Sequence, residues 1–235
     1  MNKFALIAVA GVAAAANAQL INEFQPNPTG ADPSDVGVEL LGEAGTSFSG
    51  WLLSVEADFA PPQFIDRATQ VSGVFDSNGL LVVNIADLEN PSFTFILADS
   101  FSGSIGDTWD VSLVGSVLDA IGSPDSVADE ANVIAASLGG TDFVHTGDEP
   151  KLIFRDSLDT SILYAVNDPA GTEAFDQFGN TYDLATAFFD AAGNQVDLSA
   201  GDLETFGGVN FTTIPTPGAL AAFGLAGLAA ARRRR

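Results

Sequence analysis

The stretch Leu20–Trp51 constrains the fold more than any other part of the chain, because short extended runs alternate there with turn signals, and apolar residues such as Val36, Val38 and Leu40 recur at every second position. This spacing places them on one side of an extended strand. Pro26 and Pro28 must end the first strand, since proline lacks the N–H that a central strand needs. The pattern predicts three short strands, at 20–24, 36–40 and 48–55.

Similar runs continue along the chain, separated by Gly, Pro, Asn and Asp. We expect further strands at 71–74, 80–85, 93–97, 109–114, 151–154 and 161–166. Short strands at this spacing are typical of an antiparallel sandwich or barrel, so the predicted fold class is all-β. Residues 128–138 are rich in helix formers and precede Gly139-Gly140, which favours a short helix or a single turn there.

Trp51 is the heaviest apolar side chain of the third predicted strand. A Trp in a small β domain most often fills the core, so we expect Trp51 to lie between two sheets. Stacking against a ligand is the alternative.

Residues 1–18 have the three parts of a secretory signal peptide. Lys3 supplies the positive charge, residues 4–16 form the apolar region, and Ala16-Asn17-Ala18 fits the small-residue rule for cleavage. The apolar region is shorter than the roughly 20 residues that a membrane-spanning helix needs. We therefore predict export, with cleavage after Ala18 and Gln19 as the new N-terminus.

The C-terminus has three parts as well. A proline motif comes first, made of Pro215, Thr216, Pro217 and Gly218. An apolar run at 219–231 follows, and it is only marginally long enough to span a bilayer. Four basic residues end the chain: Arg232, Arg233, Arg234 and Arg235. Such a cluster stays on the cytoplasmic side after export of the rest, so the tail is either a sorting signal or a plain membrane anchor.

The exported part is strongly acidic. All 31 Asp and Glu lie between Gln19 and Pro217, together with only Arg67, Lys151 and Arg155 of the basic residues, which leaves a net charge of −28. Such a surface repels nucleic acid, because nucleic-acid binding depends on basic side chains that release counterions. The chain has no cysteine, so disulfides and thiol chemistry are excluded, and the core must supply the stability.

The sequence offers little for catalysis. It has one histidine, His145, with Asp142 and Asp148 near it, and a His–Asp pair could act as a general base. A lone His between strands is more often a surface or turn residue. No GxSxG, HExxH or P-loop motif occurs. We expect no catalytic and no cofactor-binding residues, and hence no enzyme.

A short motif recurs three times, as Phe75-Asp76-Ser77-Asn78-Gly79, at 175–180 and at 189–194. Each copy has a Phe, an Asp that can hydrogen-bond its own turn, and a Gly that accepts a positive φ, which is typical of hairpin turns. Calcium binding is the alternative, but it needs six to eight converging oxygens. Calcium therefore stays a possible ligand with no assigned residues.

The residues of the opening stretch also carry a family resemblance. Ile21-Asn22-Glu23-Phe24, Asn27-Pro28, Val38-Glu39-Leu40 and Ser49-Gly50-Trp51 resemble the opening of bacterial lamin-tail-type domains. The resemblance implies an immunoglobulin-like antiparallel β-sandwich. This chain departs from the family pattern at Gly37, where an acidic residue and Trp often precede the second strand.

The C-terminal tail resembles the PEP-CTERM sorting signal, with Thr216 where that motif has Glu. The resemblance implies a partner, an exosortase-type membrane enzyme that cuts near the proline motif. The tail would hold the precursor in the membrane before processing.

These features predict four segments: a signal peptide at 1–18, a lamin-tail-like sandwich at 19–170, a β-rich extension at 171–213 and a sorting signal at 214–235. We expect an exported, surface-sorted, non-catalytic structural or adhesive protein of the cell envelope, outer surface or exopolysaccharide matrix. The alternative is an extracellular module that binds carbohydrate or calcium, and the third hypothesis is an accessory part of a secreted hydrolase system. Extracellular polysaccharide is a further candidate partner, and nucleic acid is not.

Overall fold

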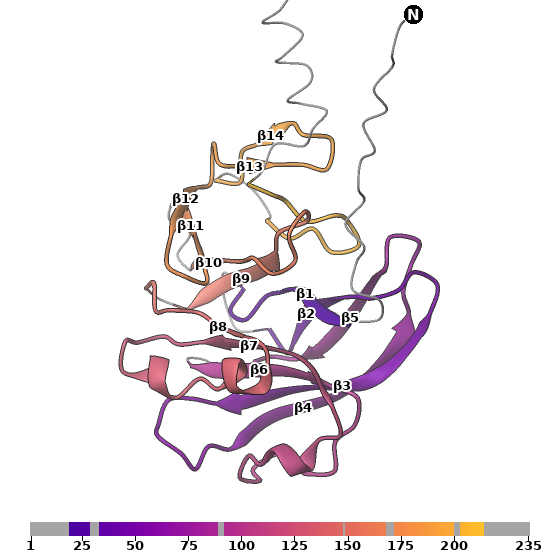
Figure 1. The fold of residues 1–235 in the computed structure, drawn as a ribbon, viewed down its shortest axis with the longest axis vertical. Coiled ribbons are helices and arrows are strands. Elements are labelled where there is room, and N and C mark those ends of the chain that lie inside the picture. The colour runs from indigo at the N-terminus through magenta and orange to yellow at the C-terminus, as the bar shows by residue number, and fades with distance from the viewer. Residues whose placement is uncertain are drawn as a thin grey trace, which may run out of the picture.

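The computed structural model describes residues 19–28, 33–88, 92–147, 149–167, 172–199 and 203–213. The described residues form two large sheets that lie one on the other as a β-sandwich (Figure 1). The strand pairs are antiparallel apart from a short parallel pair between β7 and β8. The all-β prediction is therefore confirmed at the level of a mainly antiparallel sandwich. The expected signal helix and C-terminal apolar helix lie outside the described residues.

The larger sheet has seven strands, and it combines strands from the start of the described chain with strands that follow residue 149. In spatial order these strands are β12 (Thr181–Asp183), β11 (Glu173–Asp176), β10 (Leu163–Asn167), β9 (Pro150–Arg155), β1 (Leu20–Phe24), β2 (Asp35–Leu41) and β5 (Leu80–Ala86). Because β11 pairs with β10, the sheet continues through the segment that follows residue 171.

The smaller sheet has five strands, and short 3-10 helices lie in its loops. In spatial order the strands are β4 (Ile65–Val74), β3 (Ser47–Glu56), β6 (Phe93–Ala98), β7 (Val117–Ser123) and β8 (Thr141–Asp142). The 3-10 helices are η1 (Val111–Leu113), η2 (Asp129–Ala131) and η3 (Ala135–Leu138). A separate hairpin pairs β13 (Phe188–Phe189) with β14 (Gln195–Val196).

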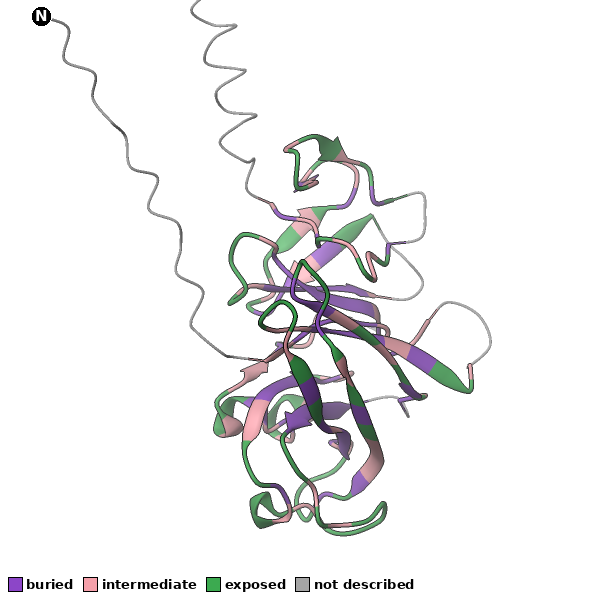
Figure 2. Cartoon of the chain, turned by 90° about the vertical axis from the view of Figure 1, so that its right-hand side faces the viewer, coloured by how far each residue is buried: buried purple, intermediate pink, exposed green. Residues whose placement is uncertain are grey.

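Apolar side chains fill three layers. The inter-sheet cluster lies between the sheets and includes Phe24, Leu40, Leu52 and Phe95. The Phe154 cluster lies on the face of β9 and β10 that points away from the smaller sheet. Apolar side chains from the segment after residue 182 pack against these strands there. The Leu53 cluster lies on the outer face of the smaller sheet. Figure 2 shows the buried residues concentrated on the strands of the sandwich, with exposed residues in the loops at its ends.

Trp51 does not lie between the sheets, and the expected position was wrong. Strand side chains alternate between faces, so Leu52 enters the inter-sheet cluster while Trp51 joins the outer Leu53 cluster. There its ring packs at 63° against Phe101, with ring centroids 5.4 Å apart, and it is only partly buried.

Two further expectations change. The predicted strand at 109–114 is a loop that contains η1, because the Asp110 side chain accepts a hydrogen bond from the Ser112 N–H at 2.8 Å and caps that turn. Such local side-chain bonds compete with strand pairing. Where a short helix or a single turn was expected at 128–138, the chain forms two short 3-10 turns, η2 and η3, and Gly139 ends the second at φ 87°.

Candidate functional site

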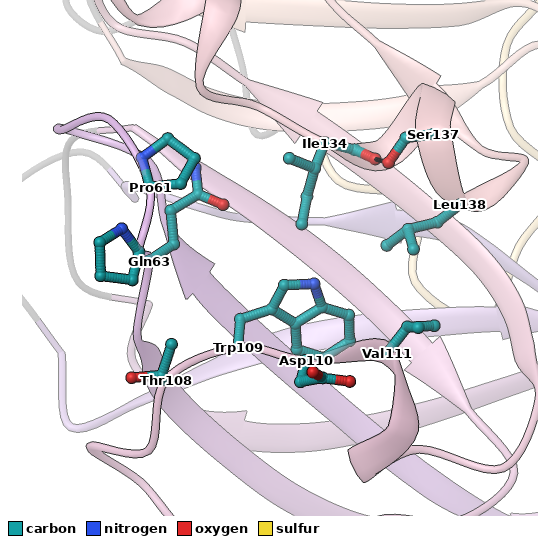
Figure 3. A pocket seen from close by; sticks show the side chains of 10 residues that line it. Pro61, Gln63, Thr108, Trp109, Asp110, Val111, Ile134, Ser137 and Leu138 are labelled. Carbon is teal, nitrogen blue, oxygen red and sulfur yellow. Dashed lines mark hydrogen bonds between the residues drawn. The ribbon is translucent and has the colours of Figure 1, made fainter.

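An open groove of about 690 Å³ lies beside the Leu53 cluster. Three segments line it: the loop Pro61–Gln63, the loop from Thr108 to Val111, and η3 with its preceding residue Ile134. Figure 3 shows Trp109 at the centre, between the Pro61 and Gln63 side chains and those of Ile134 and Leu138. The volume is within the range of ligand-binding clefts.

Backbone hydrogen bonds hold the first two segments together. The Trp109 N–H donates to the Gln63 carbonyl at 2.8 Å, and the Ile65 N–H donates to the Asp107 carbonyl at 2.9 Å. The Trp109 ring packs in part on the Leu53 cluster and leaves its remaining surface to the groove. The groove is thus built by the fold and has a largely pre-formed aromatic floor.

Polar groups surround this floor. The Asp110 carboxylate is exposed, and the hydrogen bond from the Ser112 N–H lowers the pKa of Asp110, so it is ionised at neutral pH. Gln63 donates from Nε2 to the Asn132 carbonyl, and Thr108 is exposed at the rim. Apolar surface completes the rim at Val111, whose exposed fraction is 57%.

A second group of polar side chains lies on the outer face of β1 and β2. Glu23 and Glu39 are both buried there. Glu23 accepts hydrogen bonds from the N–H and hydroxyl of Thr205, and Glu39 accepts from the Gly207 N–H and, at 2.6 Å, from Asn22. Burial raises the pKa of Glu23 to about 7 and raises the pKa of Glu39. We call this arrangement the glutamate clasp.

Gly37 explains why the clasp can form. A Cβ at this position would lie 2.7 Å from the ring of Phe206, which is too close for a real contact. The missing side chain therefore lets the segment 203–213 lie against β2. Gly37 thus has a packing role.

Three carboxylates, those of Asp58, Asp125 and Asp129, bring oxygens within 4.8 Å of one another. Ser92 donates to Asp58 and Asp125 at 2.9 and 2.7 Å, and Ser126 donates to Asp129. Calcium takes six to eight oxygen ligands. Three carboxylates already engaged by protein donors therefore do not by themselves make a calcium site.

The three repeated Phe-Asp motifs form the same turn. In each, the Asp side chain accepts from the backbone N–H two and four residues later, and the Gly has φ 80°. The Asp176 and Asp190 turns close hairpins, whereas the Asp76 turn carries the chain from β4 in one sheet to β5 in the other. Their carboxylates stabilise their own loops rather than converge on an ion.

His145 does not pair with Asp142. The His145 N–H donates to Glu130 at 2.8 Å, and Asp142 accepts from the Ala136 N–H at 3.1 Å. Neither the Nδ1 of His145 nor the Oδ1 of Asp142 has a hydrogen-bond partner among the described residues. Asp148 lies outside the described residues.

The predicted processing residues lie mostly outside the described part of the chain. Only Gln19 is described; the residues outside are Ala16, Ala18, Pro215, Thr216, Pro217, Gly218, Arg232, Arg233, Arg234 and Arg235. Within the described ranges, no helix has the length and apolar character needed to cross a membrane.

Sequence reasoning missed both the groove and the clasp. The Pro61-Pro62 pair and Trp109 are the local signals that could have pointed to the groove, yet they are far apart in the chain. Comparison of the chain with protein-family models, curated proteins and solved structures found no match.

Proposed function

We propose that this chain is an exported, surface-sorted, non-catalytic protein that acts as a structural or adhesive component of the bacterial envelope or its exopolysaccharide matrix. The observation that carries the proposal is the open, pre-formed groove around Trp109. The groove provides a binding surface on a domain that lies between a predicted signal peptide and a predicted sorting signal.

The proposal includes a finer fold assignment, an immunoglobulin-like sandwich of the lamin-tail type. Two observations support it. The motifs that carry the resemblance, at 21–24 and 38–40, fall on the adjacent strands β1 and β2. Their glutamates, Glu23 and Glu39, face the same side and hold the same later segment. This gives the two motifs a common structural purpose.

The proposal also names a route. A signal peptide directs export, and an exosortase-type enzyme recognises the proline motif at 215–218 while the apolar run holds the precursor in the membrane. The described chain ends at Thr213, close before that motif. The folded domain would therefore sit next to the membrane until the tail is cut.

Localisation tests the proposal. We expect the full chain to reach the cell surface or matrix, and a variant lacking 214–235 to appear in the medium instead. N-terminal sequencing of the exported form should start at Gln19. Retention of the full chain in the cytoplasm, or an intact Met1 on the exported form, would contradict the proposal.

A further inference from the structure

We propose that the groove around Trp109 binds a neutral saccharide chain. The inference rests on the proposed function, because it names the ligand class for the same surface. It follows from three properties of the groove: its aromatic floor, its polar rim and its charge.

The floor suits a sugar ring. A pyranose presents an apolar face of C–H groups and an edge of hydroxyl groups, and the face can pack on an aromatic ring. Trp109 offers its ring to the groove next to the apolar Val111 and Leu138 (Figure 3). Because the ring is held by the Leu53 cluster, little side-chain entropy is lost when a ligand packs on it.

The rim suits the hydroxyl groups. The Asp110 Oδ1 accepts from Ser112, and the Asp110 carboxylate is exposed, so it can accept from a sugar hydroxyl as well. Thr108 adds an exposed hydroxyl, and Gln63, which is buried and donates from Nε2 to the Asn132 carbonyl, also lines the groove. A groove with apolar and polar groups of this kind suits a sugar as ligand. It suits a helical peptide with a continuous apolar face less well.

The charge favours a neutral chain. The groove is lined by one carboxylate and by no basic side chain. Of the basic residues in the acidic part of the chain, Arg155 is buried against Asp119 and Arg67 pairs with Asp66. An anionic glycan or a nucleic acid would be repelled here.

The backbone argues against an added peptide strand. The N–H groups of Trp109 and Ile65 are already bound to carbonyls of the facing loop, and the Glu56 N–H donates to the Phe64 carbonyl at 3.0 Å. Strand addition needs a free row of such groups. The groove therefore offers side chains and ring faces, which is what a saccharide uses.

Native gel electrophoresis through polysaccharide tests this inference. The probes are dextran, hydroxyethyl cellulose and galactomannan as neutral chains, and alginate as an anionic one. The protein is isolated from the producing cells in a detergent without a sugar headgroup. We expect at least one neutral polysaccharide to retard it and alginate to have no effect. Retardation by alginate alone, or by none of the four, overturns the inference.

Variants locate the site. Trp109→Ala should raise the dissociation constant at least about tenfold, and Trp109→Phe and Asp110→Asn should raise it severalfold. Asn can still cap η1, so Asp110→Asn should fold normally. Trp109→Phe keeps an aromatic ring, so it tests the site even if Trp109→Ala fails to fold.

Phe178→Ala is the matched control, because Phe178 is an aromatic residue outside the groove with an exposed fraction of 67%. This variant should bind as the parent does. If the folded Trp109 and Asp110 variants bind the saccharide as tightly as the parent protein does, the assignment of the site is wrong.

Fluorescence gives an independent readout. The chain has two tryptophans, so Trp51→Phe leaves Trp109 as the only one. Its emission should change when the retarding saccharide is added, and an unchanged spectrum at saturation contradicts contact with Trp109. Because these measurements use purified protein, they are independent of localisation: lost sorting with intact binding overturns only the proposed function.

Discussion

Glu23, in the first strand, accepts two hydrogen bonds from Thr205, which lies 182 residues later in the chain. Glu23 is buried, and this burial raises the pKa of its carboxyl group to about 7. The contact ties the last described segment to the start of the larger sheet. We therefore expect the packing of residues 203–213 to depend on pH.

The sign of this sensitivity follows from the pKa. The folded protein keeps the Glu23 proton up to about pH 7, whereas the unfolded chain releases it near 4.5. The native state therefore binds more protons between these values, and the free energy of unfolding falls as pH rises through 7. Glu23→Gln, a neutral side chain of the same shape, should reduce this fall by up to about 3 kcal/mol. Denaturant unfolding at pH 5 and pH 8 measures it, with the exposed Glu43→Gln as control. An equal pH slope in the parent and Glu23→Gln would contradict the prediction.

The buried ion pair between Arg155 and Asp119 joins the two sheets, at 2.7 Å. Asp119 also accepts from the Ile21 N–H at 2.8 Å, and Arg155 donates to the Ile21 carbonyl at 2.8 Å. Removing one partner leaves a buried charge without compensation. We therefore expect Asp119→Ala to cost about 3–5 kcal/mol in the free energy of unfolding. The exposed control Glu43→Ala should change it by less than about 0.5 kcal/mol. A cost for Asp119→Ala as small as the control's would mean that the pair does not hold the sheets together.

Trp51 and Phe95 lie on opposite faces of the smaller sheet, and their substitution distinguishes the two layers. Phe95 is fully buried between the sheets, so Phe95→Ala should cost about 3–5 kcal/mol. Trp51 is partly exposed and packs on Phe101, so Trp51→Ala should cost less, about 1–3 kcal/mol. Chemical denaturation of both variants checks the order. A larger cost for Trp51→Ala than for Phe95→Ala would contradict the prediction and indicate that Trp51 belongs to the inter-sheet cluster.

The three parts of the tail should act together. Neutral residues in place of Arg232 to Arg235 should let the precursor pass through the membrane uncut, because each arginine costs roughly 2.5–3.5 kcal/mol at the membrane centre. Ala in place of Pro215 and Pro217 should instead leave the uncut protein in the inner membrane.

Mass spectrometry of the C-terminal peptide from the unaltered chain decides between sorting and a plain anchor. Sorting predicts that the mature protein has lost its arginines. Mature material that still ends in Arg235 would rule sorting out.

The positions of most strands could be predicted from local patterns in the amino-acid sequence. Alternation at 20–24 and 36–40, and the Phe-Asp turns, depend on neighbouring residues only, so they could be predicted from local chemistry. The prediction failed at 109–114, where the Asp110 cap formed a turn within an apolar run, and at β7 (Val117–Ser123), where no strand was predicted.

Which face of each strand packs against which layer depends on the three-dimensional arrangement of the sheets and loops. Strand alternation places Trp51 and Leu52 on opposite faces of the sheet, but it does not say which side chain points toward the other sheet. The answer depends on how the loops pack over Trp51. The groove and the glutamate clasp likewise join segments far apart in the chain, such as Gln63 with Trp109 and Glu23 with Thr205. Such pairings follow from how the sheets and later segments pack, and no local pattern in the sequence encodes them.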